Sequence, residues 1–139
     1  MTDLDPCPFC ETISDGSFRW SNEHAVAFAD GFPLNTGHTL IVPRLHVADL
    51  FELTPEVRAG VWALLDVVHA ELRDQIPADG FNVGVNVGEA AGQTVGHVHV
   101  HLIPRCLGDN ADPRGGVRWV VPARAAYWTA YWTANRTEG

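Results

Sequence analysis

Residues 91–105, "AGQTVGHVHVHLIPR", have a pattern that bears on both the fold and the function. Three histidines alternate in it with three aliphatic residues: His97, His99 and His101 against Val98, Val100 and Leu102. Successive side chains of a β-strand point to opposite faces of the sheet. The pattern therefore predicts a strand over 97–103 that ends at Pro104, with an apolar core face and a histidine face.

The histidine face requires a functional interpretation. A single strand histidine is commonly a half-buried polar residue, but packing does not favour three titratable rings in register. Three histidines could ligate zinc, with an open fourth position for water, or hold a redox metal. Alternatively, a neutral imidazole nitrogen could attack phosphorus and leave a phosphoramidate that water or another acceptor later breaks.

The residues upstream of the histidines favour the phosphorus chemistry. Gly92, Gln93 and Thr94 come directly before them, and Asn86 and Gly88 slightly earlier. Flexible backbone and neutral donors can hold phosphate oxygens without a cation.

The rest of the chain predicts one long helix among short strands. Thr54 is a suitable N-cap, Pro55 suits the first helical position, and an apolar stripe follows at three- and four-residue steps: Val57, Val61, Leu64, Leu65, Val68 and Leu72. These residues predict a helix over 55–75. Strands are expected over 24–30, 38–43, 81–88, 97–103 and 117–122. The fold class is therefore α+β, an antiparallel sheet of about five strands with one long helix packed on it.

Length and charge limit the organisation and the partners. The chain has 139 residues, 46% of them hydrophobic, which suits a single domain over 1–139. Its core is expected over about 7–105, followed by a C-terminal loop and aromatic tail over 106–139. Nine basic residues, all arginine, face seventeen acidic ones, for a net charge of −8. We therefore expect no nucleic-acid partner, because nucleic-acid binding needs a basic surface.

The start "MTDLDPCPFC" lacks the features of a signal peptide, and no window approaches the roughly 18 apolar residues of a spanning helix. We expect a cytoplasmic protein without a membrane partner, in which cysteines are thiols or metal ligands.

Cys7 and Cys10 form a C-x₂-C pair, which indicates half a zinc site or a redox pair. The redox alternative requires a strand followed by a helix N-terminus in a βαβ pattern, which this start lacks. Zinc is favoured, and it needs two more ligands. The candidates by residue type are His24, His38, His46, His69, His97 and Cys106.

These motifs together resemble the histidine triad (HIT) family of nucleotide hydrolases and transferases. "HVHVHLI" resembles its His-φ-His-φ-His-φ-φ signature, and "GQTVGHVHVHLIPR" is similar to its dinucleoside polyphosphate hydrolase members. "AFADGFPLNTGHTLIVPRLH", residues 27–46, resembles the first conserved block of the family, an Asp-x-x-Pro turn followed by Gly-His-x-Leu and Pro-x-x-His. With "CPFC", the similarity covers residues 7–105.

The resemblance implies a role for each residue around the triad. His99 would attack the α-phosphate and form a covalent nucleotidyl-histidine intermediate, held in the reactive tautomer by a backbone carbonyl. His101 would bind and neutralise the phosphate. Gln93 would lie near the bridging or leaving-group oxygen, while Thr94 and Asn86 would donate to phosphate oxygens.

The resemblance also implies a nucleoside pocket. Asp30 would accept the ribose hydroxyls, and Phe28 and the Phe32–Pro33 turn would line the base pocket. Two of these residues could instead be structural, because Asp30 could cap an Asx-type turn before Gly31 and Phe28 could belong to the core. His38 is expected to pack beneath the loop.

In zinc-containing members of the family, the remaining ligands are the histidine after the Pro-x-x block and the first triad histidine. Here these are His46 and His97, which would complete a closed, structural Cys₂His₂ zinc site with Cys7 and Cys10. No catalytic metal is expected.

The expected activity is hydrolysis or nucleotidyl transfer at the α-phosphate of dinucleoside polyphosphates or nucleoside phosphoramidates. A nucleotide-binding sensor or adaptor without turnover is one alternative, and a metal-dependent hydrolase with zinc on all three triad histidines is another. The tail "AYWTAYWTANR", residues 126–136, would stack Tyr127 on Tyr131 and Trp128 on Trp132 if helical. Such an exposed aromatic surface is expected to pack against a partner subunit or against the rim of the site. Together with the resemblance, it predicts a homodimer.

Overall fold

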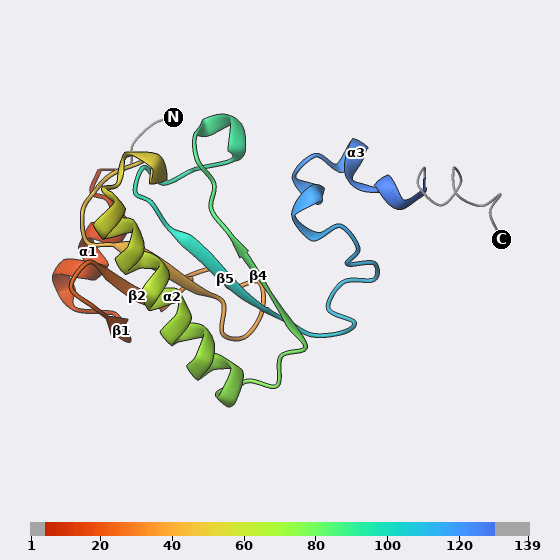
Figure 1. Cartoon of the computed structure of the whole chain (residues 1–139), viewed down its shortest axis with the longest axis horizontal. Coiled ribbons are helices and arrows are strands. Elements are labelled where there is room, and N and C mark those ends of the chain that lie inside the picture. The colour runs from red at the N-terminus through yellow and green to blue at the C-terminus, as the bar shows by residue number, and fades with distance from the viewer. Residues whose placement is uncertain (1–4, 130–139) are drawn as a thin grey trace. The chain divides into compact units, whose positions relative to one another are not determined.

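The computed structural model describes residues 5–129, and the chain divides into two compact units, Met1–Cys106 and Leu107–Gly139. The first unit has helices α1 (Pro8–Asp15) and α2 (Pro55–Gln75) and a five-stranded sheet (Figure 1). The strands are β1 (Trp20–Ser21), β2 (Ala25–Ala29), β3 (Thr39–Pro43), β4 (Gly80–Gly84) and β5 (Val100–Arg105). All neighbours are antiparallel in the order β1-β2-β3-β5-β4, which confirms the predicted fold class.

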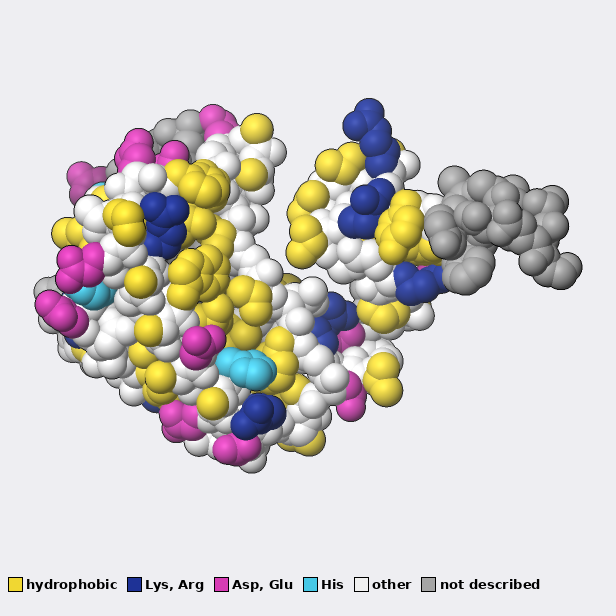
Figure 2. Space-filling view, viewed as in Figure 1, with side chains coloured by type: hydrophobic (Ala, Val, Ile, Leu, Met, Phe, Trp, Pro, Cys, Tyr) yellow, Lys and Arg dark blue, Asp and Glu magenta, His cyan; other side chains and the backbone are white. Residues whose placement is uncertain are grey.

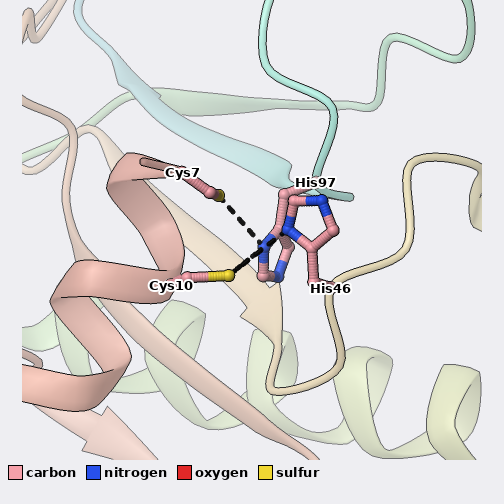
Figure 3. Close-up of side chains that lie close together, drawn as sticks. All are labelled: Cys7, Cys10, His46 and His97. Atoms are coloured by element: carbon pink, nitrogen blue, oxygen red, sulfur yellow. Dashed lines mark hydrogen bonds between the residues drawn. The ribbon is translucent and has the colours of Figure 1, made fainter. Parts of the chain in front are cut away.

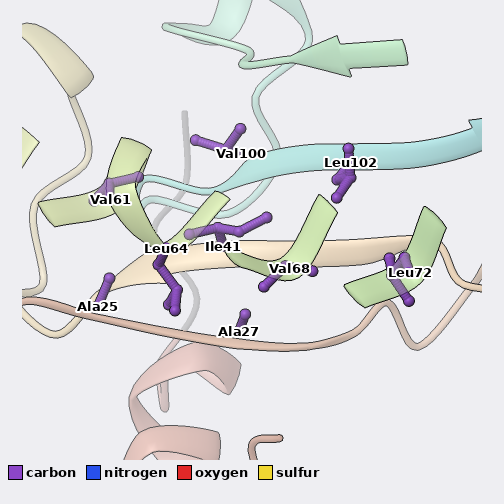
Figure 4. Close-up of a cluster of buried hydrophobic side chains, with 9 residues drawn as sticks. All are labelled: Ala25, Ala27, Ile41, Val61, Leu64, Val68, Leu72, Val100 and Leu102. Carbon is purple, nitrogen blue, oxygen red and sulfur yellow. The ribbon is translucent and has the colours of Figure 1, made fainter. Parts of the chain in front are cut away.

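Helix α2 forms over the predicted residues and for the predicted reason. The Thr54 hydroxyl accepts a hydrogen bond from the Val57 N–H at 3.3 Å, and Pro55 occupies the first turn. One stripe of the helix packs on one face of the sheet (Figure 4). The nine buried residues of this core cluster are Ala25, Ala27, Ile41, Val61, Leu64, Val68, Leu72, Val100 and Leu102.

The alternation of the triad stretch places its aliphatic residues in the interior, as predicted. Val98, Val100 and Leu102 are all buried, and Val100 and Leu102 face α2. The paired strand is shorter than expected, however, because β5 begins at Val100. Pro43, at the end of β3, has no N–H to extend the ladder, and the Val98 N–H donates instead to the Val47 carbonyl at 2.7 Å.

Other boundaries also differ from prediction. Strand β4 ends at Gly84, so residues 85–88 are loop, and Pro104 lies inside β5, opposite Phe81. Helix α1 and strand β1 were not predicted. Two 3₁₀ turns, η1 (Leu50–Glu52) and η2 (Glu89–Ala91), complete the first unit.

The described part of the second unit begins with turns and irregular backbone over 107–115 and continues with short helices. The predicted strand over 117–122 is wrong: a 3₁₀ helix, η3 (Gly116–Val120), is followed by α3 (Pro122–Ala125). Gly115 precedes η3 with a φ of 87°, which favours glycine, and Pro122 starts the next helix. Tyr127 and Trp128 lie 5.5 Å apart between ring centroids, whereas Tyr131 and Trp132 fall outside the described residues.

None of the described helices combines the length and apolarity that crossing a lipid bilayer requires.

Candidate active site and metal centre

The candidate site lies on the face of the sheet opposite α2. Strand register places Phe28 beside Leu40 and Leu40 beside His101, so these side chains form one row across β2, β3 and β5. The His99 and His101 rings follow each other on this face, with 5.2 Å between their centroids. Gly84 ends the row, and its missing Cβ leaves open space beside His101.

His99 is held in one tautomer by the backbone. Its ring is buried, 7% exposed, and Nδ1 lies 2.8 Å from the carbonyl oxygen of His97. A carbonyl oxygen only accepts, so Nδ1 carries the proton and donates it. The lone pair is therefore on Nε2, the nitrogen that a nucleophilic imidazole must offer.

His101 has the opposite tautomer, set by His38. The Leu34 N–H donates to His38 Nδ1 at 3.0 Å, so the proton of neutral His38 is on Nε2. That Nε2 lies 3.0 Å from His101 Nδ1, which must then be an acceptor. His101 consequently carries its proton on Nε2. The site therefore has an unprotonated Nε2 on His99 and, on the neighbouring His101, an Nε2–H that can donate a hydrogen bond.

Asp30 closes this chain of hydrogen-bonding groups. One carboxylate oxygen, Oδ1, accepts the Phe32 N–H at 2.8 Å, so Asp30 does form an Asx-type turn. The other, Oδ2, lies 3.3 Å from His38 Nε2 and 3.9 Å from His101 Nδ1. Asp30 therefore both shapes its turn and orients the histidine pair.

Asp30, His38 and His101 also have the separations of a metal-binding group. A metal would need the lone pair of His38 at Nε2, but the Leu34 N–H occupies Nδ1 and leaves Nε2 protonated. The three residues are better described as one donor, the Nε2–H of His38, facing two acceptors, His101 Nδ1 and Asp30 Oδ2. His38 was expected only to pack beneath the loop; the sequence signal for its role was its place in the Gly-His-x-Leu motif.

Burial keeps the rings of His38 and His101 neutral. It lowers the pKa of His101, and repulsion from His99 and His38 lowers it further, against an opposing effect of Asp30. Burial likewise lowers the pKa of His38, again opposed by Asp30. Because the ordinary histidine pKa is about 6.5, both rings are uncharged at neutral pH.

The Gln93 side chain is hydrogen-bonded to backbone groups. Its side-chain oxygen accepts the Gly88 N–H at 2.9 Å, and its NH₂ group donates to the carbonyls of Ala48 and Val95 at 2.8 and 3.0 Å. Both amide hydrogens are thus used by backbone, and the side chain is buried. Gln93 braces the loop before the triad and has no N–H left for a leaving group.

The remaining predicted site residues differ in how far they are buried. Thr94 is exposed directly after Gln93, and Asn86 is half-buried in the loop after β4. Phe28 is half-buried and packs with the apolar cluster of Val26, Leu40 and Val42. Phe32 is 92% exposed at the tip of the Asp30 turn, and Pro33 beside it is also exposed.

A second cluster brings together Cys7, Cys10, His46 and His97 (Figure 3). Cys7 is the N-cap of α1 and Cys10 follows three residues later, so one helical turn presents both sulfurs to the same side. His97 Nδ1 lies 3.5 Å from Cys7 Sγ and 3.6 Å from Cys10 Sγ, and His46 Nδ1 lies 3.3 Å from Cys10 Sγ. Sulfur and nitrogen ligands of one tetrahedral zinc are about 3.5 Å apart, given its usual bond lengths.

The tautomer of His97 also suits a metal ligand. Its Nε2–H donates to the Pro43 carbonyl at 2.8 Å, which leaves the lone pair on Nδ1, facing the sulfurs. Histidine ligands of metals are commonly oriented by such a second hydrogen bond. The other candidate ligands lie elsewhere: His24 is near Glu56, His69 packs on Phe81, and Cys106 is exposed.

The triad histidines therefore do not converge on one metal. His97 directs Nδ1 at the cysteines, whereas His99 uses Nδ1 to bond the His97 backbone. Among residues 5–129, two clusters have the geometry of a metal-binding site. One contains His97 and the other His101, and neither contains a second triad histidine.

Comparison with known proteins shows the family. The HIT domain profile matches residues 14–107. An uncharacterised HIT-like protein of Saccharolobus solfataricus is 35% identical over 101 residues, which are 70% of this chain and 73% of that protein. An adenylylsulfatase of Arabidopsis thaliana is 35% identical over 102 residues, which are 71% of this chain and 52% of that protein.

Solved structures agree. A HIT family protein from Bacillus anthracis superposes with a TM-score of 0.71 at 33% identity, over 95% of this chain and 97% of that one. A zinc-bound histidine triad family protein from Mycobacterium smegmatis gives a TM-score of 0.68 at 33% identity, over 89% and 96%. Sequence, fold and site geometry together place this chain in the histidine triad (HIT) family.

Proposed function

We propose that this protein is a nucleotide hydrolase or nucleotidyl transferase that acts at an α-phosphate through a nucleotidyl-His99 intermediate. The observation that carries the proposal is the hydrogen bond from His99 Nδ1 to the His97 carbonyl, which leaves Nε2 as a nucleophile. The opposite tautomer of His101 supports it, because that ring presents an N–H where phosphate charge would lie.

The reaction has two displacements. The Nε2 lone pair forms a bond to the α-phosphorus while the bond to the leaving group breaks and its electrons go with the leaving group. Water, or another acceptor, then attacks the phosphorus, loses its proton and restores Nε2. Phosphoryl transfer is accelerated mainly by positioning the reactants and by spreading the charge on the phosphate oxygens. Neutral hydrogen-bond donors can therefore suffice to stabilise the transition state. In this scheme His101, Thr94 and Asn86 donate to the phosphate oxygens, and Gln93 positions the loop that carries Thr94.

The proposed substrates are dinucleoside polyphosphates first and nucleoside phosphoramidates second. Asp30 would accept from ribose hydroxyls, and Phe28 with the exposed Phe32–Pro33 turn would contact the base. The relative named an adenylylsulfatase supports a substrate in which an adenylyl group carries the leaving group.

We propose further that Cys7, Cys10, His46 and His97 hold a structural zinc ion. The donor set, the separations and the His97 tautomer fit this ion, and a zinc-bound family structure supports it. The zinc would tie α1 to the segment before β5. Thiolate ligands persist in a reducing compartment, which is consistent with a cytoplasmic location.

A homodimer is proposed from the surface of the first unit. Apolar side chains gather on the face that carries α2 (Figure 2), and Trp62 on α2 and Val83 on β4 are 38% and 43% exposed. Strand β4 is at the sheet edge, where unpaired backbone groups can bond a second copy.

The intermediate predicts an adduct on one histidine. Incubating the protein with a mass-tagged dinucleoside tetraphosphate and quenching without acid should give a nucleotidyl group on His99 by mass spectrometry. His99→Asn should lose both adduct and turnover, since no other ring offers a bare Nε2 at this place. His69→Asn, on α2, is the matched control and should keep both. Nucleotide binding without adduct or hydrolysis would instead indicate a sensor.

The metal proposal predicts one zinc per chain by elemental analysis of the purified protein. Cys7→Ser with Cys10→Ser should remove it, because two of four ligands are lost, while Cys106→Ser should retain it. Hydrolysis should survive in whatever fraction of the double variant stays folded. Zinc that remains in the double variant and is required for turnover would establish the metal-dependent alternative.

The lowered pKa values of His38 and His101 predict acid-sensitive stability. In the unfolded chain both rings take up a proton near about pH 6.5, before the folded state does. Their contribution is complete above that pH and is lost as pH falls toward the folded-state pKa values. Urea unfolding at pH 7.5 and 5.5 should show this loss, and His38→Gln should reduce it. An equal loss in wild type, His38→Gln and the control His69→Gln would reject the assignment.

The dimer proposal predicts a mass of about twice 15.2 kDa by light scattering. Trp62→Glu with Val83→Glu should give a monomer, because both charges would be buried at the interface. Val67→Glu, on the flank of α2 that lies toward β1, should remain dimeric. A monomeric wild type at micromolar concentration would refute the proposal.

A further inference from the structure

Phe9 has contacts that neither the triad signature nor the metal ligand set explains. It lies on α1 between Cys7 and Cys10 and touches three other rings. The centroid distances are 5.0 Å to His99, 5.9 Å to His97 and 5.7 Å to Phe28. One aromatic side chain therefore joins the metal cluster, the proposed nucleophile and the proposed base pocket.

The His99 ring needs more than its hydrogen bond to be held in place. The bond from Nδ1 to the His97 carbonyl fixes one point, but the imidazole can still swing about it because the second side-chain torsion of histidine is broad. The direction of Nε2 depends on the plane of the ring. Rings packed against it must therefore define that plane.

Phe9 and His101 supply those contacts. Phe9 meets His99 at an interplanar angle of 66°, and His101 meets it at 65°. Such edge-to-face pairs have a preferred orientation, which an aliphatic side chain of similar volume does not impose. Phe9 is itself anchored, because it packs with the buried cluster of Val26, Leu40 and Val42.

We propose that Phe9 is a positioning residue that fixes the plane of the His99 imidazole and so aims Nε2 at the α-phosphorus. The inference rests on the proposed function for its catalytic consequence, but not for its geometry. Helix α1 thus has a second task besides presenting Cys7 and Cys10: the same turn holds a ring against the nucleophile. Phe9 itself touches no reacting atom in this scheme.

The test compares Phe9→Leu with Ile13→Ala. Ile13 is one helical turn further along α1 and packs in the same apolar cluster, so its truncation controls for loosening of the helix. Selective ¹³C labelling of histidine rings reports the order parameters of the His99 ring at pH 8, which fall when the ring swings about its Nδ1 hydrogen bond. Zinc content and circular dichroism verify that each variant keeps its metal and fold.

Wild type and Ile13→Ala should show an ordered His99 ring, whereas Phe9→Leu should show lower order parameters for that ring. With a dinucleoside polyphosphate, Phe9→Leu should lower kcat by about 10- to 100-fold with little change in KM, as expected for a misaligned nucleophile. An equally ordered His99 ring and unchanged kcat in Phe9→Leu would overturn the inference.

Failure of the proposed function and misfolding of Phe9→Leu can each be distinguished from failure of the inference about Phe9. If wild type hydrolyses nothing, the proposed function fails, while the ring order parameters still decide whether Phe9 orders His99. If Phe9→Leu does not fold, Phe9→Met keeps a flexible side chain of similar volume and is read by the same order parameters. An ordered His99 ring in that variant would again count against Phe9.

Discussion

The site depends on one hydrogen bond, from Nδ1 of His99 to the backbone carbonyl of His97. It exists because the β-ladder stops early. Pro43 cannot donate to a continuing strand, so β5 pairs only from Val100 onward and the preceding residues follow their own path. His97 then has two duties. Its ring lies between the Pro43 carbonyl and the two cysteine sulfurs, and its backbone oxygen fixes the proton of the next histidine, His99.

Chemistry on this face is divided among neutral groups with fixed proton positions. His38 receives the Leu34 N–H, and its own proton sets the tautomer of His101, with Asp30 alongside. Burial favours the uncharged form of both rings and keeps this pattern intact at neutral pH. An anionic substrate would therefore meet oriented N–H groups instead of fixed cations, in a chain whose net charge is −8.

Periodicity predicted the parts of the fold that hydrophobic burial controls. The stripe from Val57 to Leu72 gave helix α2, and the alternation of 98–102 gave the correct faces. Periodicity failed where specific contacts, and not burial, determine the local structure. The β-branched residues of 117–122 form a 3₁₀ helix between Gly115 and Pro122, and the short helix α1 has no apolar repeat long enough to detect. The tautomers, the buried amide of Gln93 and the role of His38 all depend on partners distant in the sequence, which no local pattern reveals.

In the proposed reaction a protein nitrogen, and not water, makes the first bond to phosphorus. The stereochemical course of hydrolysis distinguishes these two attacks, with a substrate whose α-phosphorus is a chiral phosphorothioate and with ¹⁸O-labelled water. Two successive in-line displacements, the first by His99 Nε2, predict net retention of configuration at phosphorus. Net inversion would mean a single direct attack by water and would rule out the nucleotidyl-His99 intermediate.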